Sequence, residues 1–170
     1  MSRGVYRIAH YPVDRLGQYR EAVLSAQASL HGPERIALSN DTALLLYGIS
    51  DLNPSQVHLT VPKSARLRRE RPEWITIHNA DLIKREVAQR QGIPVTTISR
   101  SIMDVLSTTH RADVARQAIT DALRDGLLSS PQATGLRKMI RSTTQSLPLS
   151  TQGIKGTSPD CGLQASASTR

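Results

Sequence analysis

Residues 92–106, Gly-Ile-Pro-Val-Thr-Thr-Ile-Ser-Arg-Ser-Ile-Met-Asp-Val-Leu, contain the transition that decides the fold. Pro94 lacks a backbone donor and biases Ile93 away from helix, so the first part of this stretch is predicted to be extended. Ser99 is a suitable helix N-cap and predicts a helix through Leu106 with a buried apolar face. A strand that leads directly into a helix indicates a domain built from both kinds of element.

Two stretches upstream alternate between polar and apolar residues, as half-buried strands do. They are Gln56 to Val61 and Trp74 to His78. Because a basic turn separates them, we expect them to pair as a hairpin with a long loop. Further short strands are expected at residues 3–8 and 34–38, while residues 84–91 fit a strand or a helix equally well.

Apolar residues at helical spacing predict further helices. They are expected at residues 14–30, 42–47, 112–123 and 132–141, the second of them capped by residues 39–41 and ended by Gly48 in a left-handed conformation. The sequence therefore predicts an α+β fold, with a small mixed or antiparallel sheet covered by helices.

The length of 170 residues fits one compact domain with appendages. From residue 142 onward Ser, Thr, Gln, Gly and Pro dominate, and this composition predicts a disordered tail over 142–170. The single cysteine, Cys161, excludes an intramolecular disulfide and a cysteine-based zinc site. There is no signal peptide and no apolar run of membrane-spanning length, so a cytoplasmic protein without a membrane partner is expected.

The charge is strongly basic, with a net value of +8 from 22 Lys and Arg against 14 Asp and Glu. This balance favours a polyanionic partner. The sharpest basic run lies between the two alternating strands and is predicted to contact phosphate, because guanidinium groups bind phosphate oxygens bidentately. The alternative is a solvated loop that aids solubility. The residues of this run are Lys63, Arg66, Arg68, Arg69 and Arg71.

No motif for catalysis is present, because the chain has no nucleophile elbow, P-loop or dinucleotide-binding glycine pattern. His58 and His78 fall in the two paired strands and are expected to lie near each other, but they lack a third metal ligand. Asp104 and Asp121 lie on predicted helices and are more simply explained as helix caps or as ion-pair partners of arginines than as a catalytic pair. We therefore expect no metal, no cofactor and no enzymatic activity.

Arg100 and Asp104 are four residues apart on the helix that follows residues 92–98, and can pair on one helix face. A strand-to-helix junction with a buried apolar face is enough to explain this stretch.

Four phrases taken in order resemble the AbiEi family of type IV toxin-antitoxin antitoxins. Arg3 to Arg7 looks like the end of the wing in the family's winged helix-turn-helix. Residues 39–44, followed by Tyr47 and Gly48, are similar to the family's S-x-x-T-A-L helix start. Residues 57–62, and residues 92–97 with Arg100 and Asp104, match two later phrases. The resemblance spans residues 3 to about 128.

The resemblance implies an antitoxin that represses its own operon and opposes a nucleotidyltransferase-like toxin without forming a tight complex. It assigns residues 1–12 to a remnant of the wing, 13–141 to the α+β domain and 142–170 to the tail. The helix that would enter the major groove is missing from this assignment, so DNA contact is expected to be electrostatic and weakly specific. A truncated chain, a misassigned start and a domain that works alone remain open.

Two other functions compete with a regulator. The first is a protein-interaction module that binds no nucleic acid and whose basic loop is incidental. The second is a metal-dependent nuclease that uses Asp104 and Asp121, which the absence of an acid-acid-Lys cluster disfavours.

Overall fold

The computed structural model contains both helices and strands, and it describes residues 16–28, 35–49, 51, 53–65 and 72–145. Those residues form, in chain order, α1 (Gly17–Gln27), β1 (Ala37–Leu38), α2 (Asn40–Tyr47), β2 (Val57–Val61), β3 (Ile75–Asn79), the 3-10 turn η1 (Lys84–Glu86), β4 (Val87–Arg90), β5 (Ile93–Thr96), α3 (Ile98–Thr109), α4 (Ala112–Arg124) and α5 (Ser130–Gln145). The segments predicted as a wing strand and as the end of the tail lie outside this range.

The five strands form one mixed sheet in the order β3-β2-β1-β5-β4. β1 pairs antiparallel with β2 and parallel with β5, and β4 and β5 form an antiparallel hairpin. The turn of this hairpin is Gln91-Gly92, where both residues have positive φ, as two-residue hairpin turns require. The predicted α+β class and the mixed sheet are confirmed.

The predicted hairpin of β2 and β3 is wrong, because the two strands run parallel, with Val57 opposite Ile75 and Val61 opposite Asn79. Alternation of side chains identifies a strand but does not give its direction. A parallel pair needs a crossover of about a dozen residues. Residues 62–74 supply a connection of that length, so the chain returns to the first end of β2 before β3 begins.

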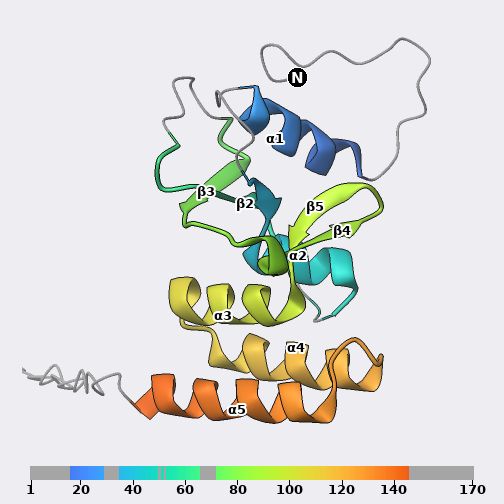
Figure 1. Cartoon of the computed structure of the whole chain (residues 1–170), viewed down its shortest axis with the longest axis vertical. Coiled ribbons are helices and arrows are strands. Elements are labelled where there is room, and N and C mark those ends of the chain that lie inside the picture. Colours follow the sequence, from blue (N-terminus) through green and yellow to red (C-terminus); the bar gives the residue numbers. More distant parts are fainter. Residues whose placement is uncertain (1–15, 29–34, 50, 52, 66–71, 146–170) are drawn as a thin grey trace, which may run out of the picture.

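The two faces of the sheet are covered differently, and α1 lies across one of them (Figure 1). On this side Tyr19 and Val23 of α1 pack against strand residues that alternate along the sheet. These are Leu38, Val57, Leu59, Val61, Ile75, Ile93 and Val95. The residues between them on β2 and β3 point to the opposite face, toward α2.

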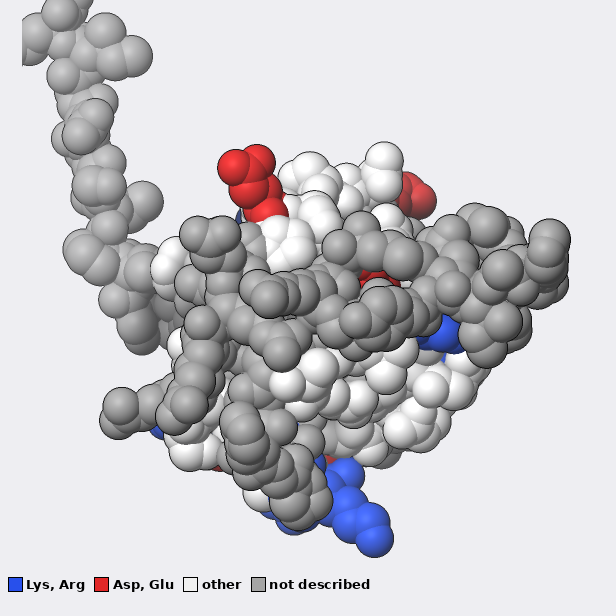
Figure 2. Space-filling view, turned by 90° about the horizontal axis from the view of Figure 1, so that it is seen from above, with Lys and Arg blue, Asp and Glu red and all other residues white. Residues whose placement is uncertain are grey.

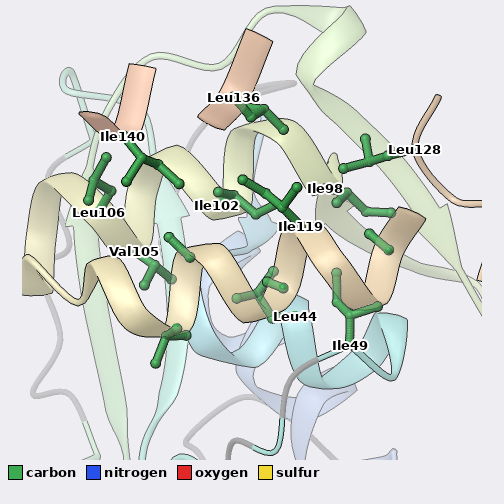
Figure 3. Packing of buried hydrophobic residues seen from close by; sticks show 14 of the residues in the cluster. Leu44, Ile49, Ile98, Ile102, Val105, Leu106, Ile119, Leu128, Leu136 and Ile140 are labelled. Carbon is green, nitrogen blue, oxygen red and sulfur yellow. The ribbon is translucent and has the colours of Figure 1, made fainter. Parts of the chain in front are cut away.

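Below α2 the helices α3, α4 and α5 stack in successive layers (Figure 1). Figure 3 shows that their apolar side chains point toward one another and toward α2. Ile102 at the centre of α3 and Ile119 of α4 are fully buried, as is Leu44 of α2. This second core joins the helical layer to the sheet through α2.

Several helix boundaries differ from those predicted: α2 begins at Asn40, within its predicted cap, and α3 continues past Leu106 to Thr109. The start of α3 and the end of α5 differ for reasons that the structure shows. Thr97, and not Ser99, precedes α3, because its N–H still bonds to Glu86 O at 2.8 Å as part of the hairpin and its carbonyl accepts from Ser101 N at 2.8 Å. α5 continues to Gln145, four residues into the segment predicted to be disordered. Buried Ile140 holds the last turns on the core, and the hydroxyls of Ser142 and Thr143 donate to Met139 O.

Two glycines are expected to respond in opposite directions to alanine substitution. Gly48 ends α2 at φ +73°, as predicted, while Gly135 lies inside α5, and an added Cβ meets nothing within 4 Å at either site. Gly48→Ala should therefore destabilise the fold by about 1 kcal/mol through backbone strain alone. Gly135→Ala should stabilise it by about 0.5–1 kcal/mol through helix propensity. Urea denaturation measures both changes in the free energy of unfolding. If both substitutions changed it in the same direction, the left-handed conformation of Gly48 or the helical conformation of Gly135 would be wrong.

Candidate functional site

The predicted phosphate-binding run is described only at its start. Lys63 is exposed just after β2, and its backbone N–H donates to Asp81 Oδ1 at 3.1 Å. Arg66, Arg68, Arg69 and Arg71 lie outside the described residues. In Figure 2, which views the molecule from the α1 end, described Lys and Arg atoms are visible only at the margins of the face. The structure therefore leaves phosphate contact by this run as a prediction.

The predicted pair of Arg100 and Asp104 is confirmed, with Nε to Oδ1 at 2.7 Å. Arg100 also reaches Glu86 Oε1 at 3.0 Å, so one guanidinium joins α3 to the η1 turn. Burial raises the pKa of Asp104, whose Oδ2 is buried without a hydrogen-bond partner, against the opposing effect of Arg100. Burial would also raise the pKa of Glu86, but bonds from Ile83 N–H and Arg100 hold it below its usual value. This is a structural ion-pair group.

The second predicted acid, Asp121, pairs with Arg124 at 3.2 Å, three residues later on α4. Each acid of the nuclease alternative is thus already paired with an arginine of its own helix. Within the described ranges, no group of three or more His, Cys, Asp or Glu could hold a metal ion. Nothing in this part of the chain favours the metal-dependent nuclease.

Buried polar groups gather on the α2 side of the sheet, where the first turn of α2 meets β2. Ser39 N–H donates to His58 O at 3.0 Å, and His58 N–H donates to Thr42 Oγ1 at 2.9 Å. Three side-chain atoms here are buried without a hydrogen-bond partner: Ser39 Oγ, Asn40 Nδ2 and Asp41 Oδ1. Asn40 also has φ +49°. Unpaired buried polar atoms and left-handed backbone are both costly, so this junction is the least relaxed part of the described fold.

His58 and His78 meet on this same face, with Nδ1 of the first 3.0 Å from Nε2 of the second. Their ring centroids are 5.3 Å apart and their planes differ by 9°. The distance between the centroids is as long as the N···N distance and the two ring radii laid end to end. Both nitrogens must therefore lie on the line that joins the centroids. The rings therefore meet edge to edge in nearly one plane, in an in-line N–H···N hydrogen bond. Their lone pairs do not converge on a common point as metal chelation requires.

Burial lowers the pKa of both imidazoles. For His78 the neighbouring His58 lowers the pKa further, and for both residues the carboxylate of Asp41 acts in the opposite direction. Asp41 is itself shared, because its Oδ2 lies 3.8 Å from Arg111 Nη1 at the start of α4. Burial thus favours the neutral form of both imidazoles, and in that form one ring can donate to the other.

A basic surface that sequence analysis missed lies on α5, the outermost helix of the stack (Figure 1). Arg137, Lys138 and Arg141 are exposed, and their spacings of three and four make them surface neighbours. None of the ion pairs between described residues involves them. The signal was available, because residues 130–145 contain no Asp or Glu.

A hollow of about 320 Å³ lies between α1 and the first residues of β2. Its lining includes Gln18, Glu21, Gln56 and Trp74. The amide of Gln56 is already occupied, since Nε2 donates to Glu73 O at 2.7 Å and Oε1 accepts from Thr76 Oγ1 at 2.6 Å. The hollow therefore points to no particular ligand.

Comparison with protein-family models and with curated proteins finds no match to this sequence. The resemblance to the AbiEi antitoxins thus rests on the quoted residues. No helix in the described ranges combines the length and the apolar character needed to cross a bilayer.

Proposed function

We propose that this chain is an antitoxin-like transcriptional regulator of a type IV toxin-antitoxin system, and not an enzyme. It acts by DNA association, by antagonism of a nucleotidyltransferase-like toxin, or by both, in the cytoplasm where those partners are found.

The observation that carries this proposal is that the later family-like phrases, distant in sequence, meet in one place. The phrase at 39–48 forms α2, the phrase at 57–62 forms β2, and the phrase at 92–106 forms β5 and α3. Hydrogen bonds join the first two, since Ser39 N–H donates to His58 O and His58 N–H donates to Thr42 Oγ1. The third joins the first through packing, since Leu44 of α2 shares a buried cluster with Ile98 and Ile102 of α3. Proteins of one family are expected to share those stretches of sequence that together form one structural junction. The meeting of α2, β2, β5 and α3 therefore supports the resemblance of this chain to the family.

DNA association is supported by charge. The exposed bases of α5 lie on the outermost helix, whereas Lys63, the first residue of the basic run, follows β2 (Figure 1). Each offers several cations to a phosphate backbone. Since both surfaces are proposed to contact phosphates and not base edges, the expected binding is weakly specific and depends strongly on salt.

A salt titration of gel shifts tests this part of the proposal and separates the two surfaces. Replacing Arg137, Lys138 and Arg141 by glutamine should reduce the slope of log K against log salt by up to about 3 if each contacts one phosphate. Glutamine at Lys63, Arg66, Arg68, Arg69 and Arg71 should reduce it by up to about 4 to 5. Arg124→Gln, which removes a base already paired with Asp121 and Asp125, is the matched control. Salt-independent binding, or no binding, contradicts DNA association.

Toxin antagonism has a separate test, in which growth is measured while the chain and its operon's toxin are co-expressed. The double substitution Arg68→Glu and Arg69→Glu should weaken DNA retention, because it reverses two charges of the basic run. If the unaltered chain retains no DNA and growth rescue survives the double substitution, the protein-interaction module is the better description. If the unaltered chain gives neither rescue nor DNA retention, the regulator proposal fails.

A further inference from the structure

The His58–His78 hydrogen bond joins a strand at the edge of the sheet to its neighbour. Among the strands of the described residues, β3 pairs with β2 alone. His58 lies on β2 opposite Thr76, and His78 lies on β3 opposite Thr60, so the two imidazoles meet diagonally across this single strand pair. Any loss of their contact acts directly on the pairing that holds β3.

The in-line geometry restricts how many protons the pair can carry. An N–H···N bond needs one donor and one acceptor, which two neutral imidazoles of complementary tautomers provide. A first added proton leaves one acceptor nitrogen and preserves the bond. After a second proton both facing nitrogens are donors, so the bond is lost and two like charges face each other at the same contact.

The surroundings offer little compensation for that second charge. From β1 and the residue that follows it, only the backbone N–H of Ser39 reaches His58. From α2 come the hydroxyl of Thr42, which accepts from the backbone of His58, and the carboxylate of Asp41. Asp41 in turn faces Arg111, from the junction of α3 and α4. One carboxylate shared with an arginine does not balance two imidazolium ions.

We propose that His58 and His78 form a proton-sensitive contact that holds the edge strand β3 on the sheet at neutral pH and releases it in mildly acidic solution. This inference goes beyond the proposed function and does not depend on it. It has a consequence for the basic run, because the connection that carries Lys63 to Arg71 is anchored by β2 at one end and by β3 at the other.

The direction of the effect follows from linkage. Because the pKa of each imidazole is lowered in the folded chain, the released or unfolded chain binds protons more readily. The contact is therefore at full strength above the ordinary histidine pKa of about 6.5, and weakens as the pH falls below it toward the lowered folded values.

Hydrogen exchange on the whole chain tests the proposal. After correction for intrinsic exchange rates, protection of the β3 amides should fall by roughly tenfold or more between about pH 7.5 and about pH 5.5. The amides of α4 should keep their protection. His78→Gln retains a side chain that can hydrogen-bond to His58 but cannot gain charge, so it should remove most of the pH dependence. His110→Gln, which removes the imidazole at the exposed C-terminal end of α3, should leave the dependence unchanged.

The unaltered chain gives a second readout that does not require a variant to fold. Imidazole ¹⁵N shifts at neutral pH should show one protonated and one unprotonated nitrogen at the facing positions. If both imidazoles become fully protonated while β3 keeps its protection, the proposal is overturned. It is also overturned if His78→Gln folds and shows the same loss of protection as the unaltered chain.

Discussion

Ile102→Ala is expected to destabilise the fold by about 3 kcal/mol. Ile102 is fully buried at the centre of α3, where side chains from α2, α4 and α5 converge on it (Figure 3). Alanine removes three carbon atoms and leaves a cavity that four packed helices cannot close together. The lost transfer free energy and the cavity therefore add.

Urea denaturation measures this loss, and an unchanged m-value shows that the transition remains two-state. The matched control is Leu24→Ala on α1, because 51% of that leucine side chain is exposed. Its removal should change the stability by less than about 0.5 kcal/mol. A loss at Ile102 no larger than that at Leu24 would show that the helical layer does not pack on α3 as described.

Arg100→Ala is the second substitution with a large expected effect, a loss of about 2–3 kcal/mol at neutral pH. Arg100 and Asp104 expose only 21% and 16% of their side chains, and the second Asp104 oxygen has no hydrogen-bond partner. Alanine would leave Asp104 ionised and largely buried without its counter-ion. Removing both charges, as in Arg100→Met with Asp104→Leu, should cost less than the single change, because no unpaired charge remains.

The pH dependence identifies the cause of that loss. Burial raises the pKa of Asp104, and Arg100 acts to lower it. Without Arg100 the pKa of Asp104 should therefore rise further. A carboxyl group with a raised folded pKa destabilises the fold above that pKa and stops doing so once it is protonated. The difference between Arg100→Ala and the unaltered chain should therefore shrink as the pH falls. Arg124→Ala, which removes a side chain that is 68% exposed and paired with Asp121 and Asp125, should cost much less than Arg100→Ala. A difference that is constant with pH would assign the loss at Arg100 to packing.

The sequence predicts elements better than it predicts their pairing. Alternation at residues 56–61 and at residues 74–78 identified both strands. His58 and His78 do lie near each other, but across a parallel strand pair and not in the predicted hairpin. The faces of the side chains were predicted correctly. The direction of β3 was not, because side-chain periodicity is the same in parallel and antiparallel strands. The length of the connection can distinguish parallel from antiparallel pairing when the connection is short. A connection as long as residues 62–74 permits both.

Composition also predicted the end of α5 wrongly and did not reveal the basic surface of that helix. Ser142 and Thr143 resemble the tail in type, yet they continue α5, since buried Ile140 anchors the turn before them. The bases of α5 were overlooked because Arg141 is separated in sequence from Arg137 and Lys138, and the helix brings it beside them. The unpaired polar atoms of Ser39, Asn40 and Asp41 are beyond prediction from sequence, because their burial depends on where β2 and α2 meet.

The central strand β1 has only two residues, and this bears on how the chain folds. Ala37 and Leu38 pair with β2, and Leu38 alone has a partner on β5, so the halves β3-β2 and β5-β4 are connected through very few backbone hydrogen bonds. Such a link is too weak to nucleate a sheet, whereas α1 and α2 each contact both β2 and β5. We infer that the two halves assemble on the helices, and that closure of the sheet at Leu38 completes folding rather than starting it.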